Sequence, residues 1–314
     1  MIVMKEGTVL QNFGCEQKIY QIGNVKIGGE PGERATVLCG SIFFRGHKIV
    51  KDNLSGAFDK DAALALLDEE AAISAETGNP RIVDVIGDTG EALARHAEFV
   101  LEKTTNPILF DSLTPKARIE ALELLQPGAD VADRIIYNSL DPNSPVDELE
   151  AISKHGIRSA VLLAFEKQAL MPDARMKLLT EPGGLLDKAG QAGIRHCLVD
   201  PGVLDVPSLA WTVITIVKVK EQLGLPGGCA PSNSVYLWKK MRAKGTPIFE
   251  SVADLVFNYP VINGADFLLY GPIGNARWVY PAVSTADAIM AYGKRAVGVR
   301  IRDKEHPLFK VFKD

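Results

Sequence analysis

Short apolar runs rich in β-branched residues alternate with longer amphipathic segments along most of the chain. The apolar runs, which we predict to be strands, are 35–44, 81–86, 107–110, 134–137, 159–165, 196–199, 227–230 and 266–270. The segments with helical spacing are 59–77, 91–103, 115–125, 146–155, 185–192, 208–223, 236–244 and 285–295. Strands that are apolar on both faces and are each followed by a helix are typical of parallel βα units. Eight such units, within the usual barrel length of about 250 residues, predict a (β/α)8 TIM barrel of the α/β class.

Other segments add detail to this prediction. Residues 17–29 alternate around Gly23-Asn24, and we expect a β-hairpin there that covers the N-terminal mouth of the barrel. Residues 45–58 and 258–265 are expected to be long excursions, the first on the catalytic face. Residues 297–313 alternate valines and arginines and are expected to form an added strand with an irregular end. No linker divides the chain, so residues 1–314 are expected to be a single domain.

The composition narrows the classes of function. The 314 residues are 46% hydrophobic and 24% charged, as expected of a soluble globular unit with a large core. A net charge of −4 provides no basic field for a phosphate backbone, so nucleic acid is not an expected partner. The longest apolar segment, 209–219, is shorter than the roughly 20 residues of a membrane span, and the N-terminal residues do not resemble a signal peptide. We therefore expect a cytoplasmic protein with no membrane segment.

Polar residues at the ends of the apolar runs are the candidates for chemistry. Barrel enzymes act at the C-terminal ends of their strands, and five of these positions hold a short carboxylate or amide: Asp84, Asp111, Asn138, Asp200 and Asn233. Each could instead cap the following helix. After Asp111, Asn138 and Asp200, however, other residues lie closer to the predicted helix start. Such side chains in one cup suit a flat heterocycle edged with N–H donors, because a carboxylate accepts from two adjacent donors as a fork.

A zinc site is an alternative use of the same barrel. Cys39, Cys197 and Cys229 lie in or beside predicted strands, but they form no CxxC pair and none stands at the C-terminal end of a strand. We expect them to be small core residues, with no metal bound directly. The sequence also contains no GxxxxGK[ST], HExxH or GxSxG motif.

The chain resembles a known family over most of its length. The segments IYQIGNVKIGGEPGERATVLCGSIFFRGHKIV, TGNPRIVDVIGDT and ADRIIYNSL are similar to the H subunit of tetrahydromethanopterin S-methyltransferase and its bacterial relatives. Among those relatives, the chain resembles in particular the methylcorrinoid:tetrahydrofolate methyltransferases of glycine betaine demethylation. The wider group is the pterin-binding methyltransferases, and dihydropteroate synthase is a more distant relation.

The resemblance gives roles to the same five residues. The family's aspartate that bonds to the pterin corresponds to Asp111 in Phe-Asp-Ser, and its strand-end asparagine corresponds to Asn138. The aspartate of its Asp-Pro turn corresponds to Asp200, and the catalytic asparagine of its Ser-Asn motif corresponds to Asn233. Asp84 corresponds to a second-strand aspartate, although the asparagine of that motif is absent here. The resemblance therefore implies a pterin held by Asp84, Asp111, Asn138 and Asp200, with Asn233 near the reacting nitrogen.

The activity implied by the resemblance is transfer of a methyl group from a methylated corrinoid protein to N5 of tetrahydrofolate. The cobalamin would arrive on a partner protein, because this chain lacks the DxHxxG segment of a cobalamin carrier. The family also implies a homodimer. The apolar, partly β-branched residues 211–219 are a candidate interface helix, and a core-facing helix of a monomer is the alternative. Two alternatives stay open: a tetrahydromethanopterin-dependent subunit that acts only within a complex, and a condensation like that of dihydropteroate synthase.

Overall fold

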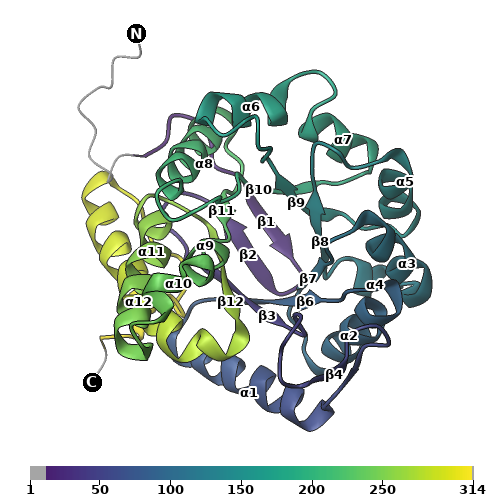
Figure 1. The fold of residues 1–314 in the computed structure, drawn as a ribbon. Helices are drawn as coiled ribbons and strands as arrows, with labels where there is room; N and C mark the ends of the chain where they lie inside the picture. Colours follow the sequence, from purple (N-terminus) through teal and green to yellow (C-terminus); the bar gives the residue numbers. More distant parts are fainter. Residues whose placement is uncertain (1–11, 313–314) are drawn as a thin grey trace.

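A closed parallel barrel forms the centre of the molecule, and the computed structural model describes residues 12–312. Its strands are β3 (Val37–Ile42), β6 (Arg81–Ile86), β7 (Ile108–Asp111), β8 (Ile135–Leu140), β9 (Ser159–Leu163), β10 (His196–Asp200), β11 (Gly228–Cys229) and β12 (Phe267–Pro272). They pair in the order β10-β9-β8-β7-β6-β3-β12-β11, and a parallel bridge between Val199 and Gly227 brings the two end strands together. The predicted TIM barrel and its eight strands are confirmed (Figure 1).

Helices surround the barrel on its outside (Figure 1). They are α1 (Lys60–Thr77), α2 (Gly90–Lys103), α3 (Pro115–Leu125), α4 (Ala129–Ala132), α5 (Val146–Lys154), α6 (Pro172–Thr180), α7 (Leu185–Gln191), α8 (Leu209–Leu223), α9 (Ser232–Leu237), α10 (Lys239–Arg242), α11 (Thr246–Ile262) and α12 (Ala276–Lys294). Three short 3-10 turns are η1 (Ile273–Asn275), η2 (Arg295–Val297) and η3 (Pro307–Phe309). Local signals set the ends: α1 begins after Asp59, which accepts from the N–H of Ala62, and ends at Gly78, whose φ of 87° favours glycine.

Some predicted helix boundaries are wrong. The segment 258–265 is not an excursion, because α11 continues to Ile262 and packs Ala253, Phe257 and Val261 into the core beside α12. The predicted helix 236–244 is broken at Trp238 into α9 and α10. The predicted helix 285–295 is the second half of the longer α12, and α6 was not predicted.

The expected strand in residues 297–313 is also wrong. The described part of this tail, up to residue 312, contains the turns η2 and η3 and no strand. A closed barrel has no free sheet edge to which another strand could pair. The alternating valines are instead divided between the core and solvent, with Val299 buried and Val297 exposed.

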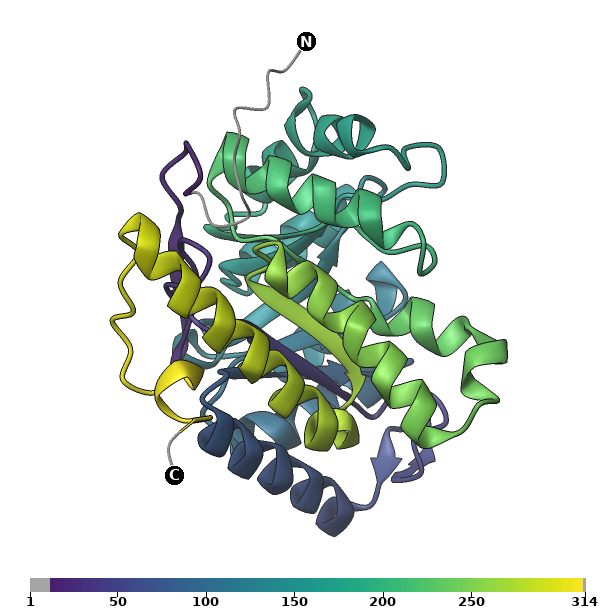
Figure 2. The ribbon, with the colours of Figure 1, turned by 90° about the vertical axis from the view of Figure 1, so that its left-hand side faces the viewer.

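The predicted hairpin is present and plugs one end of the barrel. Strands β1 (Ile19–Ile22) and β2 (Val25–Gly28) pair antiparallel around Gly23-Asn24. Three of their side chains, Ile22, Val25 and Ile27, pack with the inward-facing strand residues Val37, Cys39, Ile82, Leu109, Ile136, Val161, Leu198, Phe267 and Leu269. Figure 2 shows the hairpin at one end of the barrel and α9–α10 at the other. The C-terminal mouth is therefore the end left for a site. A smaller antiparallel pair, β4 (Val50–Asp52) and β5 (Ala57–Phe58), lies within the predicted first excursion.

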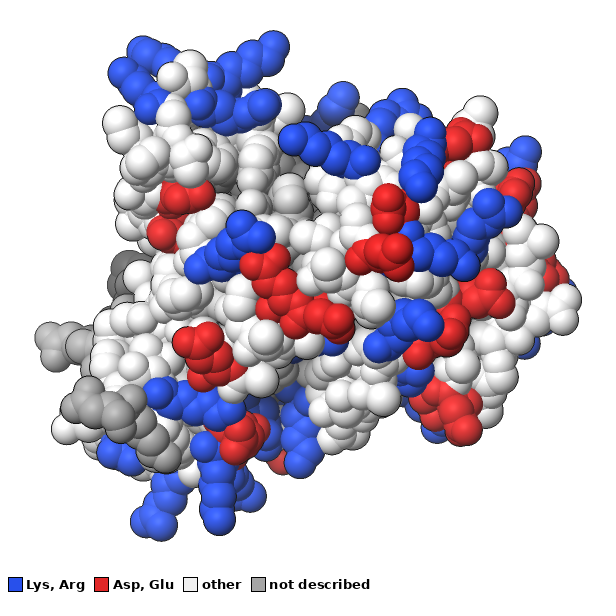
Figure 3. Space-filling model, turned by 90° about the horizontal axis from the view of Figure 1, so that it is seen from below, with Lys and Arg blue, Asp and Glu red and all other residues white. Residues whose placement is uncertain are grey.

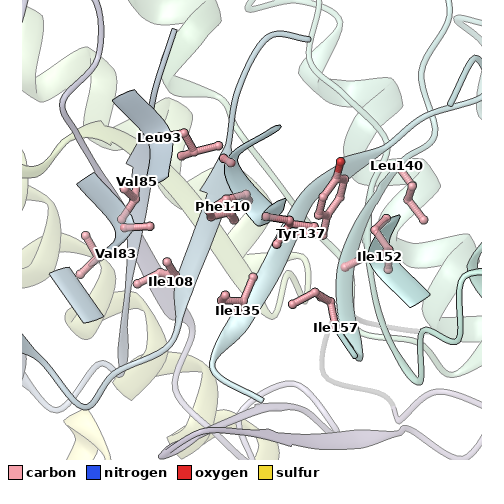
Figure 4. Packing of buried hydrophobic residues seen from close by; sticks show 14 of the residues in the cluster. Val83, Val85, Leu93, Ile108, Phe110, Ile135, Tyr137, Leu140, Ile152 and Ile157 are labelled. Carbon is pink, nitrogen blue, oxygen red and sulfur yellow. The ribbon is translucent and has the colours of Figure 1, made fainter. Parts of the chain in front are cut away.

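A second apolar layer lies between the barrel and its helices. Figure 4 shows Val83 and Val85 of β6 packed with Ile108 and Phe110 of β7 and with Leu93 of α2. Successive residues of a strand face opposite sides. Because Val83 and Val85 face the helices, Asp84 between them faces the barrel interior.

A buried ion pair ties the hairpin end of the barrel together. The Lys220 ammonium of α8 is fully buried and donates to both carboxylate oxygens of Asp266, at 2.7 Å each, and to the carbonyl of Gly29 at 3.1 Å. Asp266 also accepts from the N–H of Gly227. The pair therefore links α8, the end of the hairpin and the starts of β11 and β12.

We expect Lys220→Ala to lower the free energy of unfolding by about 3–5 kcal/mol, because the carboxylate of Asp266 stays buried without its counter-ion. Lys218→Ala on the same helix is the matched control. Lys218 pairs at 2.7 Å with the exposed Asp173, so its loss should change stability by about 0–1 kcal/mol. Urea denaturation of both variants measures the difference, and equal losses would contradict the role given to Lys220.

Candidate active site

A cavity of about 370 Å³ opens at the C-terminal ends of β7 to β11. Its polar lining residues are Asp111, Ser112, Arg118, Asn138, Ser139, Asp141, Asp200 and Asn233, and its apolar lining includes Val161, Leu163, Phe165, Ala230 and Leu269. Four of the five residues singled out in the sequence therefore share one cavity. None of the five is a helix cap: Thr89, Thr114, Pro145, Ser208 and Pro231 hold the N-cap positions of the helices that follow.

The fifth residue, Asp84, lies one layer deeper in the barrel. In the register of β6 and β7, Asp111 is opposite Ile86, two residues beyond Asp84 along the strand. Asp84 is buried, accepts a hydrogen bond from the hydroxyl of Ser41 at 2.5 Å, and bonds to the side chains of Asp111 and Asn138. Asp84 therefore supports the two strand-end residues above it.

Burial changes the acidity of this pair of carboxyl groups. Desolvation raises the pKa of Asp84 to about 6, against hydrogen bonds from Ser41, Asp111 and Asn138 that lower it. Burial raises the pKa of Asp111 well above its usual range, and the charge of Asp84 raises it further, while Arg118 opposes this. Two carboxyl groups in contact cannot both ionise easily. The pair therefore retains a proton at a pH where separate aspartates have lost theirs.

Asp200 closes a tight turn on the other side of the cavity. Its Oδ1 accepts from the N–H of Gly202 at 2.7 Å, and burial raises its pKa to about 6. Gly202 has φ of 75°, and a Cβ there would lie 2.7 Å from Phe165. Arg175 is fully buried behind this turn and donates to the carbonyl of Gly202 at 3.1 Å. The glycine after Asp200-Pro201 is thus required for the carboxylate and the Phe165 ring to lie side by side in the lining.

Asn233 lies at the rim of the same cavity. It is the second residue of α9, and its side chain is exposed. The preceding strand β11 is short and glycine-rich because it lies close to β12: a Cβ on Gly228 would lie 2.3 Å from the carbonyl oxygen of Phe267. This packing, rather than room for a ligand, accounts for the small residues of the seventh strand.

Arg118 is the main residue of the cavity lining that was not predicted from the sequence. Its guanidinium is buried, donates to Glu148 at 2.6 Å and to the carbonyl of Ser112, and lies over the ring of Tyr137. The Tyr137 hydroxyl donates to the same Glu148 oxygen at 2.7 Å. This network fixes the segment that follows Asp111. The available signal was an arginine on the apolar face of a predicted helix, beside Ala117.

The lining offers acceptors to a ligand, because its donors on Arg118 and Ser112 already bond to Glu148 and to the carbonyls of Ser112 and Gly87. Asp111 and Asp200 provide carboxylate oxygens from opposite sides, and the amides of Asn138 and Asn233 can both donate and accept. Within residues 12–312 no group of three His, Cys, Asp or Glu side chains is placed to hold a metal ion. Cys39, Cys197 and Cys229 are free thiols buried in their strands. The cavity is suited to a flat polar ring that presents N–H groups to the carboxylates.

Among the described helices, none combines the length and the apolar character needed to cross a membrane.

Solved structures of dihydropteroate synthases share this fold. A dihydropteroate synthase from Xanthomonas albilineans, crystallised with indole-2-carboxylic acid and 6-chloroguanine, aligns with a TM-score of 0.60 at 16% sequence identity, over 88% of this chain and 99% of that chain. The Yersinia pestis enzyme with a pterin–sulfa conjugate aligns with a TM-score of 0.58 at 14% identity, over 89% and 100% of the two chains. At this level of identity the likeness concerns the fold.

The curated relatives are more similar to this chain in sequence than these solved structures are. The H subunit of tetrahydromethanopterin S-methyltransferase from Methanopyrus kandleri is 36% identical, over 94% of this chain and 97% of that protein. The H subunit from Methanothermobacter marburgensis is 34% identical over 95% and 99%, and the H subunit of a putative mtx methyltransferase from Methanosarcina barkeri is 33% identical over 94% and 98%. Residues 15–302 match the family described as the tetrahydromethanopterin S-methyltransferase MtrH subunit. With the family resemblance found in the sequence thus confirmed, the chain belongs to the MtrH family of tetrahydromethanopterin S-methyltransferase subunits.

Proposed function

We propose that this chain is a methyltransferase that binds a reduced pterin in the cavity at the C-terminal mouth and transfers a methyl group between N5 of the pterin and a corrinoid carried by another protein. The observation that supports it most strongly is the convergence of Asp111, Asn138, Asp200 and Asn233 on one cavity in a chain of this family. These residues are the ones to which the resemblance gives pterin contacts.

The carboxylates match the edge of a pterin. The ring N3–H and the neighbouring 2-amino group are adjacent donors, and an ionised aspartate can accept from both. Asp111 and Asp200 are candidates for such contacts, and Asn138 has a carbonyl and an amino group for the remaining ring positions. Asp84 lies one layer deeper in the barrel and supports the side chains of Asp111 and Asn138, because it bonds to both. We therefore assign Asp84 to positioning and the other three to direct binding.

The transfer itself is a displacement at the methyl carbon. The lone pair of N5 attacks the methyl group, the carbon–cobalt bond breaks, and its electron pair stays on cobalt, while the proton of N5 leaves the product. The protein aligns nucleophile and methyl group, which is the main contribution that geometry makes to such a step. Asn233 lies at the rim, where its amide can hydrogen-bond near N5 and stabilise the charge that develops there.

The sequence relatives bear on which reduced pterin the cavity binds. The named relatives are subunits of a tetrahydromethanopterin S-methyltransferase, which favours tetrahydromethanopterin and action within a complex over tetrahydrofolate and action alone. Tetrahydrofolate stays as the second candidate through the resemblance to the tetrahydrofolate enzymes of glycine betaine demethylation. A condensation like that of dihydropteroate synthase is supported only by the shared fold.

The direct test is to incubate the purified chain with methylcobalamin carrying a 13C-methyl group and with each reduced pterin in turn. We expect the 13C signal to move from the cobalt-bound to the N5-bound position in the presence of the preferred pterin. Calorimetric titration with tetrahydromethanopterin and with tetrahydrofolate measures the preference independently of turnover. Binding of neither pterin would contradict the proposal.

We also propose that residues 1–314 act as one domain and assemble as a homodimer. Helices α8, α11 and α12 lie side by side and carry exposed apolar residues: Trp211, Ile214, Val217, Leu255, Tyr259, Ile289 and Tyr292. A patch of this kind marks an interaction surface more often than a solvated face. A second copy would cover the patch.

Substitution of the proposed pterin ligands should weaken binding more than folding. We expect Asp111→Ala to weaken pterin binding by about 1.5–3 kcal/mol, the usual range for a hydrogen bond to a charged group, with little change in Tm. Asp200→Ala also loses the bond to the Gly202 N–H, so Asp200→Asn, which keeps that acceptor, is the sharper variant. Calorimetry and thermal denaturation separate the two effects, with the exposed Asp130→Ala as control. A lower Tm with unchanged affinity would point to a structural role.

The proton held by the Asp84–Asp111 pair predicts a pH dependence. Pterin donors favour ionised Asp111, so binding releases a proton wherever the empty pocket holds one. Affinity should therefore rise as the pH is raised through the titration of this pair, by up to about tenfold per unit. In Asp84→Asn the neighbouring charge that raises the pKa of Asp111 is gone, so the rise should move to lower pH. Calorimetry in buffers of different ionisation enthalpy counts the released protons. A flat profile in the wild type would contradict proton sharing.

Kinetic measurements distinguish a catalytic role of Asn233 from a structural one. Because Asn233 is not a helix cap, Asn233→Ala should leave Tm unchanged and lower kcat by about 100-fold, with a smaller change in pterin affinity. Asn233→Ser should stay impaired, since a hydroxyl does not reproduce the reach of the amide. Asn263→Ala, at the far end of α11, is the control. Full activity of the serine variant at saturating substrates would remove Asn233 from the mechanism.

The molecular mass in solution tests the proposed homodimer. Sedimentation at micromolar concentration should give twice the 34.0 kDa mass of the chain, and Ile214→Glu on the α8 face should reduce it to the single-chain mass. A wild-type mass of one chain would contradict the dimer.

A further inference from the structure

An exposed segment at the rim of the proposed active site carries several cations that have no ion-pair partner within the described part of the chain. Residues 237–248 run from the end of α9 through α10 into the first turn of α11, and almost every side chain in this stretch is exposed. The segment carries Lys239, Lys240, Arg242 and Lys244 and contains no aspartate or glutamate. Within residues 12–312 no ion pair joins any of these four cations to a carboxylate. Figure 3, in which the C-terminal mouth is at the top, shows Lys and Arg side chains gathered at the upper left, where α10 projects.

The same segment exposes large apolar side chains. Leu237 is 72% exposed, and Trp238 and Ile248 are also accessible. Leu237 and Trp238 line an apolar hollow together with Leu204 and Val206 of the loop after β10. This hollow adjoins the active-site cavity, because the neighbouring residues Val203 and Asn233 line the cavity itself. The start of the segment, at Leu237 and Trp238, therefore lies beside the proposed active site.

Exposed apolar residues recur in most of the segments that follow the barrel strands. Six of the eight segments that follow the barrel strands present at least one: Leu54, Leu113, Val146, Met171, Leu204 and Leu237. A single exposed leucine needs no explanation, but a ring of them on one face does. A pterin in the cavity does not account for the ring, because Leu54, Val146 and Met171 lie outside the lining of the cavity. The ring fits a macromolecule that covers the mouth.

We propose that the rim, defined as residues 237–248 with the apolar ring, docks the protein that carries the methylated corrinoid, and that the contact face of this carrier is acidic around an apolar centre. This inference rests on the proposed function, which requires the methyl group to arrive over the mouth. Charge supports it: the chain is negative overall, so a local group of four cations without carboxylate partners attracts and orients an acidic partner at this one place. The apolar ring then provides the area that is buried on contact.

The experiment compares two methyl donors with the same enzyme. The donors are free methylcobalamin and a corrinoid protein reconstituted with methylcobalamin, each assayed with the preferred pterin. We expect Lys239→Glu combined with Lys240→Glu to raise KM for the protein donor by about tenfold and to leave transfer from free methylcobalamin unchanged. The rise in KM with added salt should also be smaller in this variant. Lys26→Glu combined with Lys304→Glu, on exposed residues at the hairpin end, is the matched control.

A second pair of variants tests the apolar part. Leu237→Ser should weaken use of the protein donor, whereas Leu124→Ser should not, since Leu124 is 61% exposed but lies on α3, away from the mouth. Unchanged KM for the protein donor in both rim variants would overturn the docking surface, as would a wild type that accepts free methylcobalamin but not the protein. Equal loss with both donors would overturn it too, because the segment would then belong to the pterin site. Absence of transfer from free methylcobalamin in the wild type, with no pterin binding, is the separate failure of the proposed function.

Discussion

Closure of the parallel barrel is the constraint on which the rest of the structure depends. Because all eight strands run in the same direction, their C-terminal ends form one ring, and residues separated by more than a hundred positions become neighbours. Asp111 and Asn138 are side by side in the register of β7 and β8, and Asp200 and Asn233 complete the cavity from the far side. The hairpin blocks the opposite end with Ile22, Val25 and Ile27. Access is thereby restricted to the mouth where the polar residues lie.

The polar residues at this mouth are held in an unfavourable state that a ligand can relieve. Burying carboxyl groups is expensive unless they gain hydrogen bonds, and the raised pKa values of Asp84, Asp111 and Asp200 record how incompletely they gain them. A ring that brings N–H donors supplies the missing bonds. Burial therefore destabilises the carboxylates in the empty cavity and, for the same reason, favours binding of a heterocycle rich in N–H donors.

Sequence periodicity predicted the barrel well because its strands are buried on both faces and keep a clear apolar signal. It failed in two places. Residues 258–265 were expected to be an excursion, but α11 extends to Ile262 because Phe257 and Val261 are buried against α12. The alternating valines of the tail suggested a strand, but the closed barrel provides no edge. In the site, the strand-end rule found the aspartates and asparagines. It missed Arg118, because that residue enters the cavity from a helix and is buried only through its contacts with Glu148 and Tyr137.

In the proposed complex, a reduced pterin binds in the cavity with its donor edge on the strand-end carboxylates. A crystal structure with the preferred pterin tests it most directly. We expect the ring within hydrogen-bond distance of Asp111, Asn138 and Asp200, with N5 facing Asn233 and the mouth above it open to a carrier. A pterin bound elsewhere, such as the cavity of about 470 Å³ at the hairpin end lined by Lys26, Arg34 and Arg302, would contradict it.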